Sequence, residues 1–311
     1  MGHEAFRRAI LNDRADDAAR LVYADWLQGE GMDAGQGDEA RAEFIRVQVR
    51  LNNTGLHKAE RKALLAREKA LLDANRERWL DEDLAHVPPA QMEGMQRGLL
   101  TFTRGFADVM TMTDAERDVI RQMHVPGMPP GEMFAQLVEQ REHTLPGQNH
   151  SAGITVPELK TLIAAGLDAN AELPMMHGQP IFAVLDYFGK DARLPSLQLL
   201  ADAGANLNAR SSDREFATPL HFIASERPKF IPEARLLVRN GASTRLKDEN
   251  DLTVRAYIEE ADGPKSKLLA AINDEERETR KQKPLSDKIP RKGSGFRRGR
   301  AGGDANPPQE S

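Results

Sequence analysis

Apolar positions in the first fifty residues recur at helical spacing. Segments 4–12 and 17–28 each place their large apolar side chains on one face, and Asp16 or Asp17 suits the N-cap of the second segment. A glycine-rich loop separates them from a third amphipathic segment, 38–52. The chain is therefore predicted to begin with a small group of short helices.

A longer helix is predicted from about Lys58 to Leu80, where strong helix formers dominate. Leu65, Leu72 and Trp79 recur every seven residues, a spacing typical of a coiled-coil seam. The same stripe also suits packing onto the three preceding helices. We favour packing, because the stripe is short for a coiled coil.

The middle segment, residues 86–153, carries weaker signals. Two short strands are predicted at 99–103 and 106–110, and Thr113 with Glu116 resembles a capping box that begins a helix. A second helix is predicted over 132–142. We interpret this segment as an adaptor whose last helix covers the exposed end of the following repeats.

A recurring pattern occupies the second half of the chain. Gly166, Gly204 and Gly241 lie 38 and 37 residues apart, and each follows an apolar segment with helical spacing. Glycine suits the left-handed turn that ends many helices. A fixed period of this size indicates stacked units, none of which buries its apolar face alone.

The segment Thr218-Pro-Leu-His-Phe-Ile-Ala224 resembles the Thr-Pro-Leu-His-x-x-Ala core of the ankyrin repeat. Thr218 suits a helix N-cap and Pro219 suits the first helical turn. The resemblance implies that the ring of His221 bonds the backbone of the adjacent repeat. We favour that structural role for His221 over a catalytic one.

The resemblance covers about three to four units over residues 154–276. Their period exceeds the roughly 33 residues of an ankyrin repeat, and we expect the extra residues at Lys190–Pro195 and Arg227–Pro232, between paired helices. The unit beginning near Asn250 lacks the proline and is interpreted as a C-terminal cap that ends near Glu276.

The N-terminal segments resemble a second family. The runs Arg20-Leu-Val-Tyr-Ala-Asp-Trp-Leu27 and Ala42-Glu-Phe-Ile-Arg46 are similar to the bacterial repeat-companion domain, over roughly residues 4–52. Members of that family usually precede repeat arrays, often leucine-rich ones. The resemblance implies no catalytic residue.

Several polar residues of these runs invite a functional interpretation, but structural roles are the stronger expectation. Trp26 is expected to anchor the core. Arg20, Asp25, Glu43 and Arg46 are expected to form ion pairs that fix how the helices cross.

Composition narrows the possible chemistry. The chain has no cysteine, which excludes disulfides and thiolate sites and agrees with a reducing cytoplasm. The histidines show no metal-ligand spacing, and no phosphate-binding loop or serine-nucleophile motif is present. No signal peptide or membrane-spanning apolar run is found. We therefore expect no enzymatic activity, no cofactor and a cytoplasmic location.

The predicted fold class is mainly α. The expected order is a helical repeat-companion-like domain over 1–85, an adaptor over 86–153, a short ankyrin-like α-solenoid over 154–276, and a disordered basic tail over 277–311. Such stacks usually serve as binding surfaces, so the sequence predicts a protein-binding scaffold with an unidentified protein partner.

The partner is expected at the concave face and at the tips of the turns between units. The candidate residues are Met175, Met176, His177, Gln179, Arg210, Ser211, Asp213, Arg214, Glu215, Asp248, Asn250 and Asp251. The adjacent methionines suit an adaptable contact surface, and equally suit packing between neighbouring turns.

The tail supports an alternative function. Residues 277–311 hold ten lysines and arginines against four acidic residues, whereas the rest of the chain is acidic. With Phe296 among them, these cations suit nucleic acid or another polyanion, and they equally suit a solubilising tail. The candidates are Lys281, Lys283, Arg291, Lys292, Arg297, Arg298 and Arg300.

Overall fold

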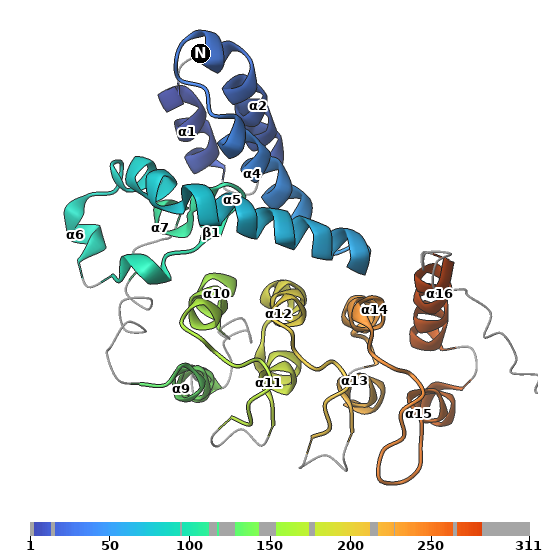
Figure 1. The fold of residues 1–311 in the computed structure, drawn as a ribbon. Coiled ribbons are helices and arrows are strands. Elements are labelled where there is room, and N and C mark those ends of the chain that lie inside the picture. The colour runs from blue at the N-terminus through green and yellow to red at the C-terminus, as the bar shows by residue number, and fades with distance from the viewer. Residues whose placement is uncertain are drawn as a thin grey trace, which may run out of the picture.

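The computed structural model describes residues 3–13, 16–93, 95–111, 117, 128–142, 154–173, 178–211, 217–226, 228–263 and 266–281. These residues are mainly helical, as predicted, and contain one two-stranded sheet (Figure 1). The N-terminal part, residues 3–111, lies over one side of a double row of helices formed by residues 130–281.

Four short helices begin the N-terminal part, and three of them match the predicted segments. They are α1 (His3–Asn12), α2 (Asp17–Gln28), α3 (Glu30–Asp33) and α4 (Glu39–Leu51). Asp16 and Asp38 cap α2 and α4 by accepting backbone N–H bonds. Helix α2 packs mainly against α4. Trp26 is buried in the hydrophobic cluster of these helices, 5.5 Å from the ring of Phe6 in α1, which confirms its expected role as a core anchor.

Helix α5 (Lys58–Leu84) extends four residues beyond the predicted end. The seven-residue apolar stripe of α5 packs against other helices of the chain. Trp79 is fully buried and stacks on Phe44, and Leu65 and Leu72 lie partly buried against the hydrophobic cluster that contains these two rings. The stripe is therefore part of the core of the N-terminal part. The coiled-coil alternative is wrong, because the apolar face is already covered.

The adaptor contains the predicted hairpin in shortened form. After α6 (Pro89–Met92) and a 3-10 turn, η1 (Arg97–Leu99), the strands β1 (Phe102–Thr103) and β2 (Phe106–Ala107) pair antiparallel, and α7 (Asp108–Thr111) follows directly. The two-residue turn between the strands has positive φ at both positions. The helix predicted from Thr113 lies outside the described residues, except for Arg117.

Residues 130–281 form two parallel rows of helices (Figure 1). The first-helix row consists of α9 (Pro130–Glu142), α11 (Pro180–Tyr187), α13 (Pro219–Glu226) and α15 (Val254–Asp262). The second-helix row consists of α10 (Val156–Ala164), α12 (Lys190–Asp202), α14 (Ile231–Asn240) and α16 (Lys267–Lys281).

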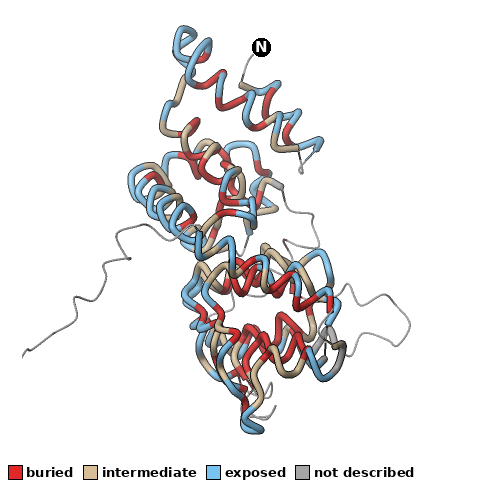
Figure 2. The backbone as a smooth tube through the Cα atoms, turned by 90° about the vertical axis from the view of Figure 1, so that its right-hand side faces the viewer, coloured by how far each residue is buried: buried red, intermediate tan, exposed pale blue. Residues whose placement is uncertain are grey.

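One hydrophobic cluster runs through both rows, from Met133 to Ile272. Figure 2 shows buried positions concentrated along these helices. Helix α9 occupies the first place in the first-helix row, where Phe134 stacks on Phe188 at 6.2 Å between ring centroids. Helix α9 packs against α10 and α11 at this end of the rows.

The expected position of the extra residues is wrong at Lys190–Pro195. Helix α12 begins at Lys190, and Pro195 lies inside it. The backbone N–H groups of Ala192 and Arg193 bond the carbonyl of Gly189, which forms the first turn. Pro195 has no N–H to donate to a helical hydrogen bond, but burial of Leu197 and Leu200 keeps the segment helical. At the other expected position, Ile231 and Pro232 belong to α14.

The recurring glycines end three second-row helices in the same way. Gly166, Gly204 and Gly241 have φ of 99°, 87° and 108°, in the left-handed region. In each case the N–H of the next residue donates to a carbonyl five positions earlier, at 2.9 Å. The sequence period is therefore matched by a repeated local structure.

Candidate interaction surface

Two asparagines join consecutive turns. Asn170 and Asn208 each lie four residues after a repeat glycine. The Oδ1 of Asn170 accepts from the N–H of Asn206 at 2.6 Å, and its Nδ2 donates to the carbonyl of Gly204 at 3.1 Å. These bonds fix one unit against the next, and the sequence analysis missed them although both asparagines share one repeat position.

Asn208 repeats the arrangement one unit later. Its Oδ1 accepts from the N–H of Ser243 at 2.7 Å, and its Nδ2 donates to the carbonyl of Gly241 at 3.4 Å. The equivalent position in the following unit is Arg245, where this series ends. The same two bonds thus set the spacing of three successive turns.

His221 connects α13 to the next unit. Its Nδ1 accepts from the N–H of Thr218 at 3.3 Å and lies 2.8 Å from the Thr218 hydroxyl, so Nε2 carries the proton and donates to the carbonyl of Leu252 at 3.1 Å. Burial lowers the pKa of His221, which keeps the ring neutral. These contacts confirm the expected structural role.

Three turns join the second-row helices to the following first-row helices, and backbone bonds close each of them. The N–H of Leu173 donates to Gly178, that of Ser211 to Ala217, and that of Asp248 to Leu252, all at 3.0–3.1 Å. These turns lie on the side of the molecule away from α5 (Figure 1). The described residues of the three turns lie along one edge.

The third turn is described completely, and Asp248 holds it together. Its carboxylate accepts from the N–H groups of Asn250 and Leu252 and from the Tyr257 hydroxyl, at 2.8–3.0 Å. Burial opposes ionisation, but these bonds hold the pKa of Asp248 below its usual value. Asp251 adopts a positive φ and pairs with Lys247 at 2.7 Å.

The candidate tip residues differ in accessibility. Arg210, Asn250 and Asp251 are exposed, and Gln179 is half-buried. Asp248 and Ser211 are buried, so the expectation that they face a partner is wrong for these two. Asp248 is buried because it satisfies the backbone of its own turn. The remaining candidates lie outside the described residues: Met175, Met176, His177, Asp213, Arg214 and Glu215.

The tail candidates lie almost entirely outside the described residues. Lys281, the last residue of α16, is exposed and pairs with Glu278 at 2.7 Å. The candidates from Lys283 to Arg300 fall in the part of the chain that the structure does not describe. Polyanion binding by the tail therefore stays a prediction.

The two middle helices of the first row, α11 and α13, present few side chains to solvent. Every residue from Pro180 to Leu185 in α11 is buried, as is every residue from Pro219 to Ala224 in α13. Ser225 is an exposed position at the end of α13, and the outer helices α9 and α15 carry further exposed residues, such as Gln136 and Glu259.

The charged residues of the N-terminal part form ion pairs, as expected in outline. Arg46 pairs with Asp25 at 2.6 Å between α4 and α2. Glu43 pairs with Arg67 of α5, and Arg20 donates to the carbonyl of Asp16. Glu43 and Arg20 therefore bind residues other than the four that were expected to pair with one another.

A second charged cluster in the N-terminal part is fully buried, and the sequence analysis missed it. Asp83 has no exposed surface, and its carboxylate accepts from Arg41 and from the N–H of Ala107, both at 2.8 Å, with Arg7 at 3.5 Å. The Arg41 guanidinium also lies over the Trp79 ring, 5.1 Å from its centroid. The cluster joins four elements of the N-terminal part and offers no route to solvent.

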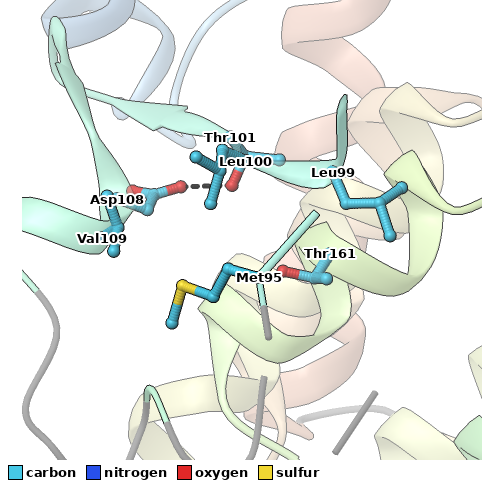
Figure 3. A pocket seen from close by; sticks show the side chains of 7 residues that line it. All are labelled: Met95, Leu99, Leu100, Thr101, Asp108, Val109 and Thr161. Atoms are coloured by element: carbon cyan, nitrogen blue, oxygen red, sulfur yellow. Dashed lines mark hydrogen bonds between the residues drawn. The ribbon is translucent and has the colours of Figure 1, made fainter. Parts of the chain in front are cut away.

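A small hollow separates the adaptor from α10 (Figure 3). Met95, Leu99, Leu100 and Val109 line it together with Thr161 of α10, and Thr101 donates to Asp108 at its edge. The hollow has no room for a water-sized molecule. It is a packing gap and not a ligand site.

No family model matches the chain, and comparison with curated proteins and with solved structures gives no match. Within the described ranges, no helix is long and apolar enough to cross a membrane. The same residues contain no group of three side chains suited to holding a metal ion.

Proposed function

We propose that the chain is a non-enzymatic scaffold that binds a protein partner through the turns between its helical units. The observation that carries this proposal is the edge of three turns, which share one backbone closure and face away from the N-terminal part. A series of turns along one edge suits contact with an extended surface better than it suits a small ligand.

The ankyrin-like interpretation of residues 154–276 belongs to this proposal. It is supported by the left-handed glycines, by the His221 contact with the next unit, and by the two asparagines that repeat the same bonds. Burial of the helix residues Pro180–Leu185 and Pro219–Ala224 supports contact through the turns, with Arg210, Asn250 and Asp251 as the accessible candidates.

The test is affinity purification of the full chain from a lysate of its own cells, after nuclease treatment. The variant Arg210→Ala/Asn250→Ala/Asp251→Asn, in which asparagine tolerates the left-handed φ of position 251, is compared with a control that carries three exposed substitutions elsewhere: Asp73→Ala, Asp274→Ala and Arg277→Ala. We expect the turn variant to lose a stoichiometric protein that the control retains, with equal thermal stability. Retention of that protein by the turn variant contradicts the assignment of the surface.

A further inference from the structure

The N-terminal part contacts three consecutive units along the second-helix row. Lys160 of α10 donates to the Thr103 hydroxyl and lies 3.4 Å from the carbonyl of Phe102. Arg61 of α5 binds Asp202 of α12, and Lys58 reaches the end of α14. Each contact involves a different unit, so one rigid part spans the series.

The contact at Asp202 is the most specific of the three. Both nitrogens of the Arg61 fork bind the carboxylate, at 2.6 and 2.7 Å, and both side chains are largely buried. Each side chain is also held by a bond within its own half of the interface. Arg61 donates to the carbonyl of Leu51 in the N-terminal part at 2.7 Å, and Asp202 accepts from Gln198 of α12 at 3.0 Å. A bidentate pair held on both sides fixes distance and orientation.

Two further bonds join the start of α5 and the loop before it to the end of α14. The Lys58 ammonium donates to the carbonyl of Asn240 at 2.9 Å, where the last carbonyls of a helix favour a cation. Arg239 donates to the carbonyl of Thr54 while it pairs with Glu275 of α16 at 2.7 Å. Arg239 therefore links the N-terminal part indirectly to the last helix of the row.

This interface is polar, unlike the two interiors that it joins. The hydrophobic clusters of the described residues fall into one for the helix rows and two for the N-terminal part, and no cluster crosses between them. Without a shared apolar core, charged contacts and backbone acceptors determine the fit. Such interfaces resemble transient contacts between proteins and weaken with salt.

We propose that the second-helix row is a binding surface for the chain's own N-terminal part, which acts as a brace held by charge. The brace fixes the angle between consecutive units, which in a linear stack depends only on neighbouring units. The brace also covers the second-helix row, on the side opposite the turns. A partner at the turn edge therefore meets turns whose spacing the brace fixes. The inference concerns the N-terminal part and holds whether or not the turns bind a protein.

Because the chain contains no cysteine, a labelled pair can be introduced without background. Ala66→Cys on α5 and Ala270→Cys on α16 are both exposed sites, one on each side of the interface. Spin labels at these sites report the distance between the two parts in the full chain. We expect one narrow distance distribution at low salt and only partial broadening at 1 M salt, because salt screens exposed contacts such as that of Lys58 but screens the largely buried Arg61–Asp202 pair much less.

Two variants make the test specific. Arg61→Gln/Lys58→Gln removes two contacts from the N-terminal side, and Asp202→Asn removes the bidentate pair from the repeat side; both should lose the narrow distribution at low salt. The control, Arg67→Gln, removes a charged contact from the same helix that stays inside the N-terminal part. Equal helical content by circular dichroism shows that each variant is folded.

The proposal is overturned if the parent chain already gives a broad distribution. It is equally overturned if both interface variants keep the narrow one, or if Arg67→Gln broadens it as much as they do.

Discussion

At the scale of single residues, His221 illustrates how a residue type associated with catalysis serves the fold. Its two ring nitrogens satisfy the N-cap of its own helix and a carbonyl of the next unit. Replacement by alanine leaves the Leu252 carbonyl without its donor and opens a space beside Tyr257. We expect His221→Ala to lower the unfolding free energy by about 1–3 kcal/mol in urea denaturation, whereas the exposed substitution Asn250→Ala should change it little.

The buried histidine also predicts a direction of pH dependence. Burial holds the pKa of His221 below the 6.5 of the unfolded chain, so the unfolded state binds the proton first as the pH falls. Stability from this group is complete above pH 6.5 and declines as the pH falls towards the lower folded pKa. His3 has a pKa lowered by burial and by Arg7, and acts in the same direction.

A substitution separates the contribution of His221 to the pH dependence of stability from that of the other titrating groups. In His221→Gln the amide can still donate to the Leu252 carbonyl but does not titrate. We expect the loss of unfolding free energy between about pH 7 and pH 5 to be smaller in this variant than in the parent. Equal losses in the two proteins would show that His221 does not contribute to the pH dependence.

Individual residues were predicted well where one local rule applied. Thr218 and His221 follow a short motif, and Trp26 is a large apolar residue within a helical pattern. Asp248 was misplaced because an acidic residue in a turn suggests exposure, whereas its carboxylate bonds its own backbone. The buried Arg41–Asp83 pair joins residues 42 positions apart, and no local pattern indicates such a contact.

At the scale of elements, the repeat glycines allow a controlled test of helix termination. Gly204 has φ of 87°, and a Cβ added there would meet no atom within 4 Å, so only backbone conformation opposes a side chain. We expect Gly204→Ala to destabilise the chain by about 1–2 kcal/mol in urea denaturation.

The control for that change is Gly98→Ala, where the added Cβ would also meet open space and φ lies outside the left-handed region. It should leave stability nearly unchanged. A similar cost at both glycines would mean that the left-handed turn does not matter to the fold.

The helices themselves were largely predictable because caps and apolar periodicity are local. Asp16, Asp38 and Thr155 all cap the helices that follow them. The exception is α12, where Pro195 suggested a break but burial of the following leucines keeps the segment helical. Tertiary burial overrode a local signal there, and sequence periodicity carries little information about it.

At the scale of the whole molecule, the two parts have different consequences for function. The helix rows present a series of turns on one side, and the N-terminal part occupies the other. The position of the N-terminal part was not predictable, because its contacts join residues as far apart as Thr54 and Arg239 through polar groups. Polar contacts of this range leave no periodic pattern in the sequence.

The central claim is that the turn edge contacts a protein partner. Its most direct test is a photo-crosslinking residue placed at Asn250 in the third turn, compared with one at Asp73 on the exposed side of α5, both in the full chain in its own cells. We predict one discrete protein adduct from position 250 that is absent from position 73. An adduct from position 73 alone, or the same adduct from both positions, would contradict binding at the turns.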